Sequence, residues 1–250
     1  SLSYGLVCED ELYLFDPART AEFYIEFAKS KDLKIAKTFE THLQADYISG
    51  SRQIAQSENA QLVANENDFS IANFEYHKVA DGEQIICKDG KTTVKAIHTP
   101  GHTPGSTSYL IDDTFLISGD AVFIKSIGRP DLGGQVEAWS KLLFETIQHI
   151  LKKLDNQIKV IPGHYMDWTE MSDQGLCMET LGTIIDHNRD IYNLNDVNRF
   201  TDFIKANMRK QHDVYGEIRK INAGLLEPSP DEQKIMDVGK NECAASAAQK

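Results

Sequence analysis

The sequence predicts a mixed α/β fold of the αββα sandwich type, with a helical extension at its C-terminal end. Strand-like runs fill the first two-thirds of the 250 residues with helical patterns interleaved, whereas the last third carries helical patterns alone. Hydrophobic residues make up 41% of the chain, which is enough to bury a substantial core. Because no low-complexity linker divides the chain, we expect one domain over residues 1–240, a helical extension from about residue 175 and a tail at 241–250.

The first elements alternate between strands and helices. Glu9 and Asp10 interrupt two apolar runs and predict a hairpin, while Phe23 and Phe27 lie four residues apart, which is helical spacing. In chain order we expect a hairpin of 4–7 and 11–15, a helix over 21–28, a strand over 33–38, a helix over 49–56 and a strand over 61–64.

The middle of the chain is rich in turn signals, and the end is helical. Asp-Gly pairs at 81–82 and 89–90 separate short apolar runs, and Pro228 and Pro230 interrupt the last helical pattern. We expect strands at 74–79, 83–87, 92–97, 107–111 and 114–117, a long amphipathic helix over 136–154, a strand at 158–161 and helices over 175–192, 196–208 and 211–222.

The overall charge restricts the kinds of partner. A net charge of −12 argues against binding to nucleic acid or to an anionic membrane, because both require concentrated Lys and Arg. No apolar run is long enough to span a bilayer, and no export signal opens the chain. The four cysteines, Cys8, Cys87, Cys177 and Cys243, form no CxxC pair, so we expect reduced thiols in a cytoplasmic protein.

Four short motifs carry the chemistry of this chain. Each places a His or Asp where a predicted strand gives way to a polar or Gly-rich turn. Residues from distant parts of a chain can share a metal ion only if several strand ends converge on one rim, where imidazole and carboxylate groups can lie about 2.0–2.2 Å from the ion. The motifs are THLQADY at 41–47, TPGHTPG at 99–105, SGDAVF at 118–123 and PGHY at 162–165.

The order of these motifs resembles the metallo-β-lactamase superfamily, whose signature is HxHxDH followed by a His, an Asp and a late His. The resemblance covers nearly the whole chain and implies the same αββα sandwich. Two positions depart from the signature, because Gln44 and Tyr47 stand where the second and last His of HxHxDH would be. A neutral amide and a phenol with an ordinary pKa near 10 are poor zinc ligands, so a site for two zinc ions is weakened.

An intact set of two imidazoles and one carboxylate remains at His42, His102 and Asp120. This is the facial triad of non-haem Fe(II) oxygenases, which leaves three coordination positions open. Asp46 and His164 would help hold a second ion in binuclear members; here we take them, with Tyr165, as candidate catalytic residues. Two alternatives stay open: Asp46 caps the helix that begins near Ser49, and His164 contacts a bound water.

One branch of the superfamily resembles this chain most closely, namely the persulfide dioxygenases, including those fused to rhodanese domains. The strings that carry the resemblance are FETHLQADYISGSRQIA, HTPGHTPGS, SGDAVFIKSIGRPDLGG and IPGHY. It implies one Fe(II) per chain, held by His42, His102 and Asp120, and oxidation of glutathione persulfide or a similar persulfide by O2 to sulfite and thiol. It also leaves open a homo-oligomer and a rhodanese partner or fusion.

Two residues are expected to face the substrate. Arg129 either grips a carboxylate of the thiol carrier or pairs with Asp131 or Asp120 to lock its loop. Tyr165 would donate a hydrogen bond to the bound substrate. We expect Cys177 to be a buried structural thiol rather than a redox group.

Two other functions are compatible with the motifs. The first is a zinc-dependent thioester hydrolase of the hydroxyacylglutathione hydrolase (glyoxalase II) type, which the changes at Gln44 and Tyr47 disfavour. The second is a non-catalytic interaction module, which the intact triad disfavours. Metal analysis distinguishes the three functions as one iron, two zincs or no metal.

Overall fold

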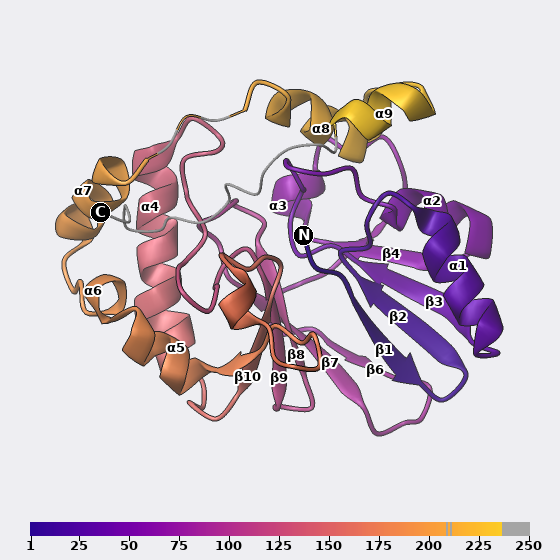
Figure 1. Ribbon diagram of the computed structural model, residues 1–250, viewed down its shortest axis with the longest axis horizontal. Coiled ribbons are helices and arrows are strands. Elements are labelled where there is room, and N and C mark those ends of the chain that lie inside the picture. The colour runs from indigo at the N-terminus through magenta and orange to yellow at the C-terminus, as the bar shows by residue number, and fades with distance from the viewer. Residues whose placement is uncertain (209, 211, 237–250) are drawn as a thin grey trace.

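Two β-sheets pack face to face and helices cover both outer faces, which confirms the predicted αββα sandwich (Figure 1). The computed structural model describes residues 1–208, 210 and 212–236. Gln211, which belongs to an expected helix, and the expected tail at 241–250 lie outside the described residues.

The first sheet holds the N-terminal third of the chain. β1 and β2 form the predicted antiparallel hairpin, and β2, β3, β4 and β5 are parallel neighbours. The parallel strands therefore end at the same edge, where the loops that follow them come together. In order across the sheet the strands are β1 (Tyr4–Cys8), β2 (Glu11–Phe15), β3 (Lys34–Phe39), β4 (Gln61–Ala64) and β5 (His77–Lys78).

The second sheet is mostly antiparallel. Only β9 and β10 run parallel to each other, so the loops after these two strands also share an edge. In order across the sheet the strands are β11 (Glu179–Thr180), β10 (Lys159–Pro162), β9 (Phe115–Gly119), β8 (Thr107–Ile111), β7 (Thr93–His98) and β6 (Gln84–Ile86).

The alternation of side chains along β2 explains the layers. Tyr13 and Phe15 point between the sheets, into an apolar cluster that includes Tyr109 from β8. Leu12 and Leu14 point the other way, against the helices α1 (Ala21–Ser30) and α2 (Ser51–Glu58). Because successive strand side chains face opposite sides, one strand of five residues contributes to two cores.

The outer face of the second sheet is covered by the later helices. Leu110, Leu116 and Val160 from its strands pack with buried residues of these helices in the largest apolar cluster. The helices are α4 (Val136–Glu145), a π-helical turn (Thr146–Ile150), a short 3-10 turn (Leu151–Lys153), α5 (Leu181–His187), α6 (Arg189–Tyr192) and α7 (Val197–Ala206). The predicted helix over 136–154 is therefore one helical run with a widened turn in its middle.

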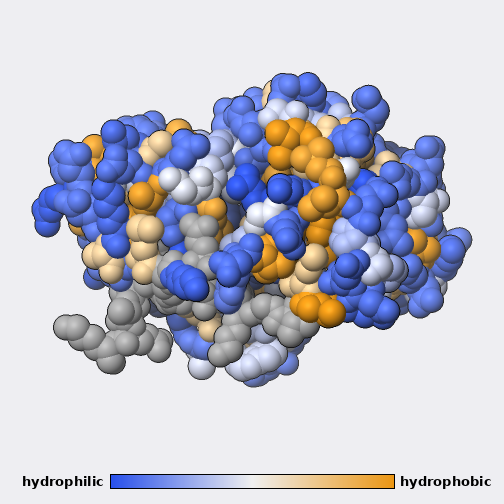
Figure 2. All heavy atoms as spheres, turned by 90° about the horizontal axis from the view of Figure 1, so that it is seen from above, coloured by the Kyte–Doolittle hydropathy of each residue, from blue (hydrophilic) through white to orange (hydrophobic). Residues whose placement is uncertain are grey.

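The last helices return to the first half of the chain. Asn222, at the end of α8 (Tyr215–Asn222), donates to the backbone oxygens of Gln44 and Tyr47 and accepts from the backbone N–H of Ser49. The face seen from above, onto which α8 folds, is mostly hydrophilic and is crossed by a band of hydrophobic residues (Figure 2).

Several predicted boundaries are wrong. The strand expected over 74–79 is only β5, because Phe74 and Tyr76 pack with Phe69 in an irregular aromatic group. Residues 175–178 are not helical, since Cys177 bridges to Met171 before β11.

Three short helical elements were not expected. The short helix α3 (Glu66–Phe69) and a 3-10 turn (Trp168–Glu170) lie in segments that we had not assigned to helices. The helix α9 (Pro230–Met236) begins at Pro230. Proline interrupts the interior of a helix, but it is favoured at the first helical position.

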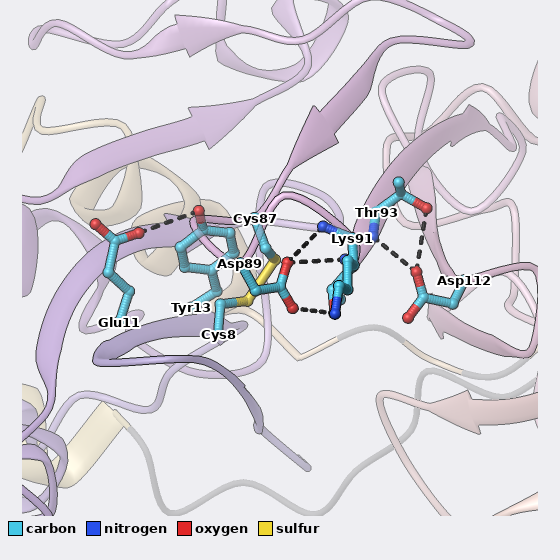
Figure 3. Close-up of a disulfide and its surroundings, with 9 residues drawn as sticks. Cys8, Glu11, Tyr13, Cys87, Asp89, Lys91, Thr93 and Asp112 are labelled. Carbon is cyan, nitrogen blue, oxygen red and sulfur yellow. Dashed lines mark hydrogen bonds between the residues drawn. A yellow bond between two sulfur atoms is a disulfide. The ribbon is translucent and has the colours of Figure 1, made fainter.

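The cysteines correct a further expectation. Cys8 and Cys87 form a disulfide between the two sheets (Figure 3), although they are separated by 79 residues in the sequence. Both are buried in the inter-sheet core, so the expectation of reduced thiols is wrong for this pair. Cys177 is a free buried thiol, as expected, and Cys243 lies outside the described residues.

None of the described helices combines the length and apolar character needed to cross a bilayer. The cytoplasmic location stays a prediction.

Candidate metal centre

His42, His102 and Asp120 lie together where three chain segments meet. His42 follows β3, His102 lies in the turn between β7 and β8, and Asp120 follows β9. Their exposed fractions are 3%, 1% and 2%, and their potential ligand atoms all lie within 4.8 Å of one another. The shared edge of parallel strands and the antiparallel β7–β8 turn bring these distant residues to one rim.

The geometry of the three side chains suits one ion. Asp120 Oδ2 is 3.6 Å from His102 Nε2 and 4.0 Å from His42 Nε2. Atoms that coordinate one ion at about 2.0–2.2 Å lie roughly 3–4 Å apart. Neither carboxylate oxygen of Asp120 has a hydrogen-bond partner in the described part of the chain. A buried carboxylate that accepts no hydrogen bond is costly, and a cation between the three groups would offset that cost.

The orientation of His102 is fixed by a backbone carbonyl. Its Nδ1 is 3.0 Å from the backbone oxygen of Arg129, and because a carbonyl only accepts, Nδ1 must carry the proton. Nε2 is then left unprotonated for a metal. Burial lowers the pKa of His102 to about 4 against the opposing charge of Asp120, so the imidazole is neutral at neutral pH, as a metal ligand must be.

A buried aspartate that the sequence analysis missed fixes His42. Asp16 accepts the backbone N–H of Thr41 at 2.8 Å and the hydroxyl of Thr41 at 2.7 Å. That hydroxyl lies 3.0 Å from His42 Nδ1, and since its own proton goes to Asp16, it accepts from Nδ1–H. Such supporting contacts orient metal-binding histidines. The available signal was an Asp-Pro pair directly after β2, which is the parallel neighbour of β3.

Arg129 does not face an open site. Its guanidinium forms a two-pronged pair with Asp131, with Nε to Oδ1 at 2.7 Å and a terminal nitrogen to Oδ2 at 2.5 Å, and it is 3% exposed. Of the two roles expected for Arg129, the geometry fits the loop lock and not the grip on a substrate carboxylate. The locked loop is the one whose carbonyl orients His102.

The same loop packs directly on Asp120. A Cβ atom at Gly128 would lie 1.8 Å from the backbone oxygen of Asp120, so only glycine fits there. The loop therefore supports both His102 and Asp120.

Asp46 and His164 form a second pair beside the three residues. His164 Nε2 is 3.2 Å from Asp46 Oδ2 and 3.5 Å from Asp120 Oδ1. Burial favours the neutral forms of both, but opposite charges outweigh it. The charge of His164 lowers the pKa of Asp46, and the charges of Asp120 and Asp46 raise the pKa of His164. The alternative role of Asp46 as a helix cap is wrong, because α2 has Gly50 at its N-cap and no side-chain cap bond.

The two residues that depart from the signature interact with groups other than the three ligand candidates. Tyr47 is buried and its hydroxyl donates to the backbone oxygen of Asp16 at 3.2 Å. Burial raises the pKa of the Tyr47 phenol well above its usual 10, which disfavours a phenolate ligand. The Gln44 side chain donates a hydrogen bond to Glu40. Burial raises the pKa of the Glu40 carboxyl to about 8, and the hydrogen bonds from Ser49 and Gln44 oppose that rise.

Tyr165 follows His164 and lies at the surface of the large apolar cluster. Its ring is tilted against that of Trp168 with centroids 5.3 Å apart, and Trp168 is 76% exposed. Tyr165 and Trp168 therefore lie together toward the surface, on the segment that carries His164.

The fold and the arrangement of these residues define a metal-dependent enzyme of the αββα sandwich type. The chain belongs to the metallo-beta-lactamase superfamily, whose family model matches residues 2–173. The chain is 31% identical to a crystal structure of a metallo-beta-lactamase from Staphylococcus aureus, with a TM-score of 0.79 over 90% of this chain and 69% of that one.

Curated relatives include two kinds of enzyme. The mitochondrial persulfide dioxygenase ETHE1 of Homo sapiens is 27% identical over 162 residues, which are 62% of this chain and 59% of that protein. A hydroxyacylglutathione hydrolase from Prochlorococcus marinus is 28% identical over 163 residues, 62% of this chain and 60% of that protein. The chain thus spans about three-fifths of the length of these two relatives. A crystal structure of ETHE1 from Myxococcus xanthus, 22% identical with a TM-score of 0.72 over 90% of this chain and 93% of that one, bears on the fold alone.

Proposed function

We propose that this chain is a mononuclear iron dioxygenase that oxidises the outer sulfur of glutathione persulfide, or of a similar small persulfide. The observation that carries the proposal is the buried cluster of His42, His102 and Asp120, together with the contacts that Tyr47 makes with Asp16 and Gln44 makes with Glu40. Two neutral imidazoles and one carboxylate are the ligand set of non-haem Fe(II) oxygenases. The similarity to ETHE1 supports the same chemistry.

The reaction balances with dioxygen and water. The outer sulfur of the persulfide gains both atoms of O2 and one oxygen of water, the S–S bond breaks, and sulfite, the free thiol and two protons leave. When bound, iron supplies open coordination positions for the persulfide sulfur and dioxygen and the electrons that activate dioxygen.

The side chains of the site would hold the ion, carry a proton and contact the substrate. His42, His102 and Asp120 hold the ion, while the neighbouring Asp46–His164 pair, in contact with Asp120 Oδ1, holds a proton beside the reacting sulfur. Tyr165 would donate a hydrogen bond to the substrate from the outer side of this segment.

A zinc-dependent thioester hydrolase is the second candidate, because the hydroxyacylglutathione hydrolase relative is as similar in sequence as ETHE1. Hydrolases of this kind use a metal-bound hydroxide, for which zinc lowers the pKa of water to about 7. The neutral Tyr47 and the position of Gln44 disfavour it here.

Two measurements on one preparation decide between these functions. We expect protein purified without added metal to contain one iron per chain, and the iron-loaded protein to consume O2 and release sulfite when glutathione persulfide is added. Two zincs per chain, with hydrolysis of a glutathione thioester and no O2 consumption, would overturn the proposal in favour of the hydrolase. No bound metal and neither activity would favour an interaction module.

A further inference from the structure

A buried carboxylate outside the candidate metal centre joins the two loops that carry its histidines. Asp68, on the short helix α3, is 5% exposed. Its Oδ2 accepts the backbone N–H of Leu43 at 2.9 Å and the hydroxyl of Thr103 at 2.6 Å, and its Oδ1 accepts the backbone N–H of Gly105 at 2.7 Å. Three donors thus converge on one carboxylate from two separate segments.

Two of these donors belong to the residues that directly follow metal ligands. Leu43 follows His42, and Thr103 follows His102. A shift of Asp68 would therefore move the His42 loop relative to the His102 turn. The ring centroids of the two histidines are 4.8 Å apart, so a change of a few tenths of an ångström between the loops is large on the scale of metal coordination.

The contact between Asp68 and the His102 turn is close. A Cβ atom at Gly105 would lie 2.6 Å from Asp68 Cγ, so the backbone can approach the carboxylate only because residue 105 is glycine. Within the turn, the Thr103 hydroxyl also lies 2.8 Å from Ser106 Oγ, which accepts the Thr103 backbone N–H at 3.0 Å. Asp68 therefore holds a turn that also has hydrogen bonds of its own.

Local structure holds Asp68 itself in place. Asn65 caps α3 by accepting the backbone N–H of Asn67 at 2.9 Å. Phe69, the residue after Asp68, is buried in an apolar cluster that also contains Leu43. The helix is thus fixed to the His42 loop by apolar packing on one side and by the carboxylate on the other.

Only a carboxylate satisfies all three donors. An ionised Asp offers acceptors on both oxygens, whereas an Asn of the same size presents an NH2 group to at least one of the donors. That exchange removes a charge-assisted hydrogen bond and places two donors against each other in a buried space.

We propose that Asp68 is a positioning residue of the metal centre, which sets the spacing of His42 and His102 and through it the affinity and the coordination geometry of the ion. The inference rests on the metal centre proposed above, but not on the identity of the metal or the substrate.

The test compares Asp68→Asn with Asp89→Asn in the full chain. Asp89 also accepts three hydrogen bonds, from the backbone N–H groups of Lys91 and Thr92 and from the Thr92 hydroxyl, but it lies in a surface turn (Figure 3). Co²⁺ titration gives the affinity, and the visible absorption of bound Co²⁺ reports the coordination geometry. We expect Asp68→Asn to bind Co²⁺ roughly ten- to a hundred-fold more weakly, with an altered spectrum, and Asp89→Asn to match the wild type.

A merely structural role gives a different result. It would lower the melting temperature of Asp68→Asn but leave the affinity and the spectrum of the folded protein unchanged. That outcome would overturn the inference. A wild-type chain that binds no Co²⁺ would instead overturn the metal centre itself.

A second pair of variants decides the matter if Asp68→Asn does not fold. Thr103→Val removes the hydroxyl that donates to Asp68, while Thr103→Ser keeps it. We expect weaker Co²⁺ binding and an altered spectrum in Thr103→Val and near wild-type behaviour in Thr103→Ser. Equal affinities in these two variants would count against Asp68 as a positioning residue.

Discussion

At the scale of single residues, Asp120 connects two groups of side chains. Its Oδ2 faces the Nε2 atoms of His42 and His102, and its Oδ1 faces His164, which pairs with Asp46. One carboxylate can therefore bind an ion through one oxygen and contact a proton-carrying pair through the other. In the proposed function, this arrangement would place the Asp46–His164 pair next to the site of sulfur oxidation.

The roles of His102 and Tyr47 can be separated by mutation. We expect His102→Ala to lose bound metal and activity, because removing one of only three proposed protein ligands lowers the metal affinity strongly. Tyr47→Phe should keep its metal, since the phenol is neutral and donates to Asp16. Metal analysis of both purified variants provides the measurement. Loss of metal from Tyr47→Phe would identify the phenol as a ligand and contradict the assignment.

Arg129 should affect stability and metal content together. Removing one partner of a buried, two-pronged ion pair costs about 3–5 kcal/mol, so we expect Arg129→Ala to lower the melting temperature and to weaken metal binding through the loop that orients His102. Arg189→Ala is the control, because Arg189 forms a similar pair with Asp186 on the surface. A raised KM at full metal content and unchanged stability would restore a substrate-binding role.

Cys177 should react slowly with thiol reagents. Burial, and after it the charge of Glu170, raise the pKa of this thiol to about 12. The thiolate is the reactive form of cysteine. Because the pKa rises from an ordinary value near 9 to about 12, the fraction of thiolate at neutral pH falls roughly a thousand-fold. We expect native protein to leave Cys177 unmodified by iodoacetamide while the denatured protein is labelled, as read by peptide mass spectrometry. Rapid labelling of the native protein would contradict the buried position.

At the scale of elements, the widened turn after α4 lies against the candidate site. The π-helical turn begins at Thr146, whose hydroxyl donates to the backbone oxygen of Pro100 at 2.7 Å. Pro100 lies two residues before His102, in the turn that Asp68 also contacts through Thr103 and Gly105. Such turns are frequent at functional sites, and this one attaches a core helix to a ligand-bearing loop.

We expect Thr146→Val to lose about 1 kcal/mol of stability and to bind metal a few-fold more weakly, because the hydroxyl bond to the His102 turn is lost. Thr201→Val is the matched control, since its hydroxyl bonds to Val197 within its own helix. Chemical denaturation and metal titration of both variants test this. Metal affinities that fall equally in the two variants would show that the attachment to Pro100 has no special effect.

At the scale of the whole molecule, the disulfide joins the two halves of the sandwich. Cys8 ends β1 in the first sheet, and Cys87 directly follows β6 in the second. A cross-link between residues 79 positions apart restricts the unfolded chain, which in the chain-entropy model stabilises the fold by roughly 4 kcal/mol. The disulfide therefore holds the first sheet to the second at the end of β1.

We expect Cys87→Ser to lower the free energy of unfolding by roughly 2–4 kcal/mol and to leave the metal content unchanged, since the disulfide lies in the inter-sheet core and not among the ligand candidates. Treatment of the wild type with a reductant should have the same effect, and treatment of Cys87→Ser should add nothing. Urea denaturation with and without reductant gives the comparison. Identical curves for reduced and oxidised wild type would mean that the bond contributes no stability.

The sequence by itself determined the elements that depend on short-range patterns. The short apolar runs at residues 11–15 and 61–64 predicted β2 and β4 to the residue, because such runs suit strands that are buried on both faces. The three ligand candidates could also be predicted, since His42, His102 and Asp120 stand where strands end, and strand ends share edges. The strand predicted over residues 74–79 was too long, because Phe74 and Tyr76 pack against Phe69 instead of pairing with a neighbouring strand.

Only the tertiary structure decided which distant residues support the site. Asp16 meets Thr41, and Asp68 meets Leu43 and Thr103, because parallel strands and the opposing sheet bring their loops to one rim. Cys8 and Cys87 meet because the two sheets face each other, although the two residues lie 79 positions apart in the sequence. Residue type and spacing set each segment, but such partners depend on how the two sheets face each other, and local patterns carry no information about that.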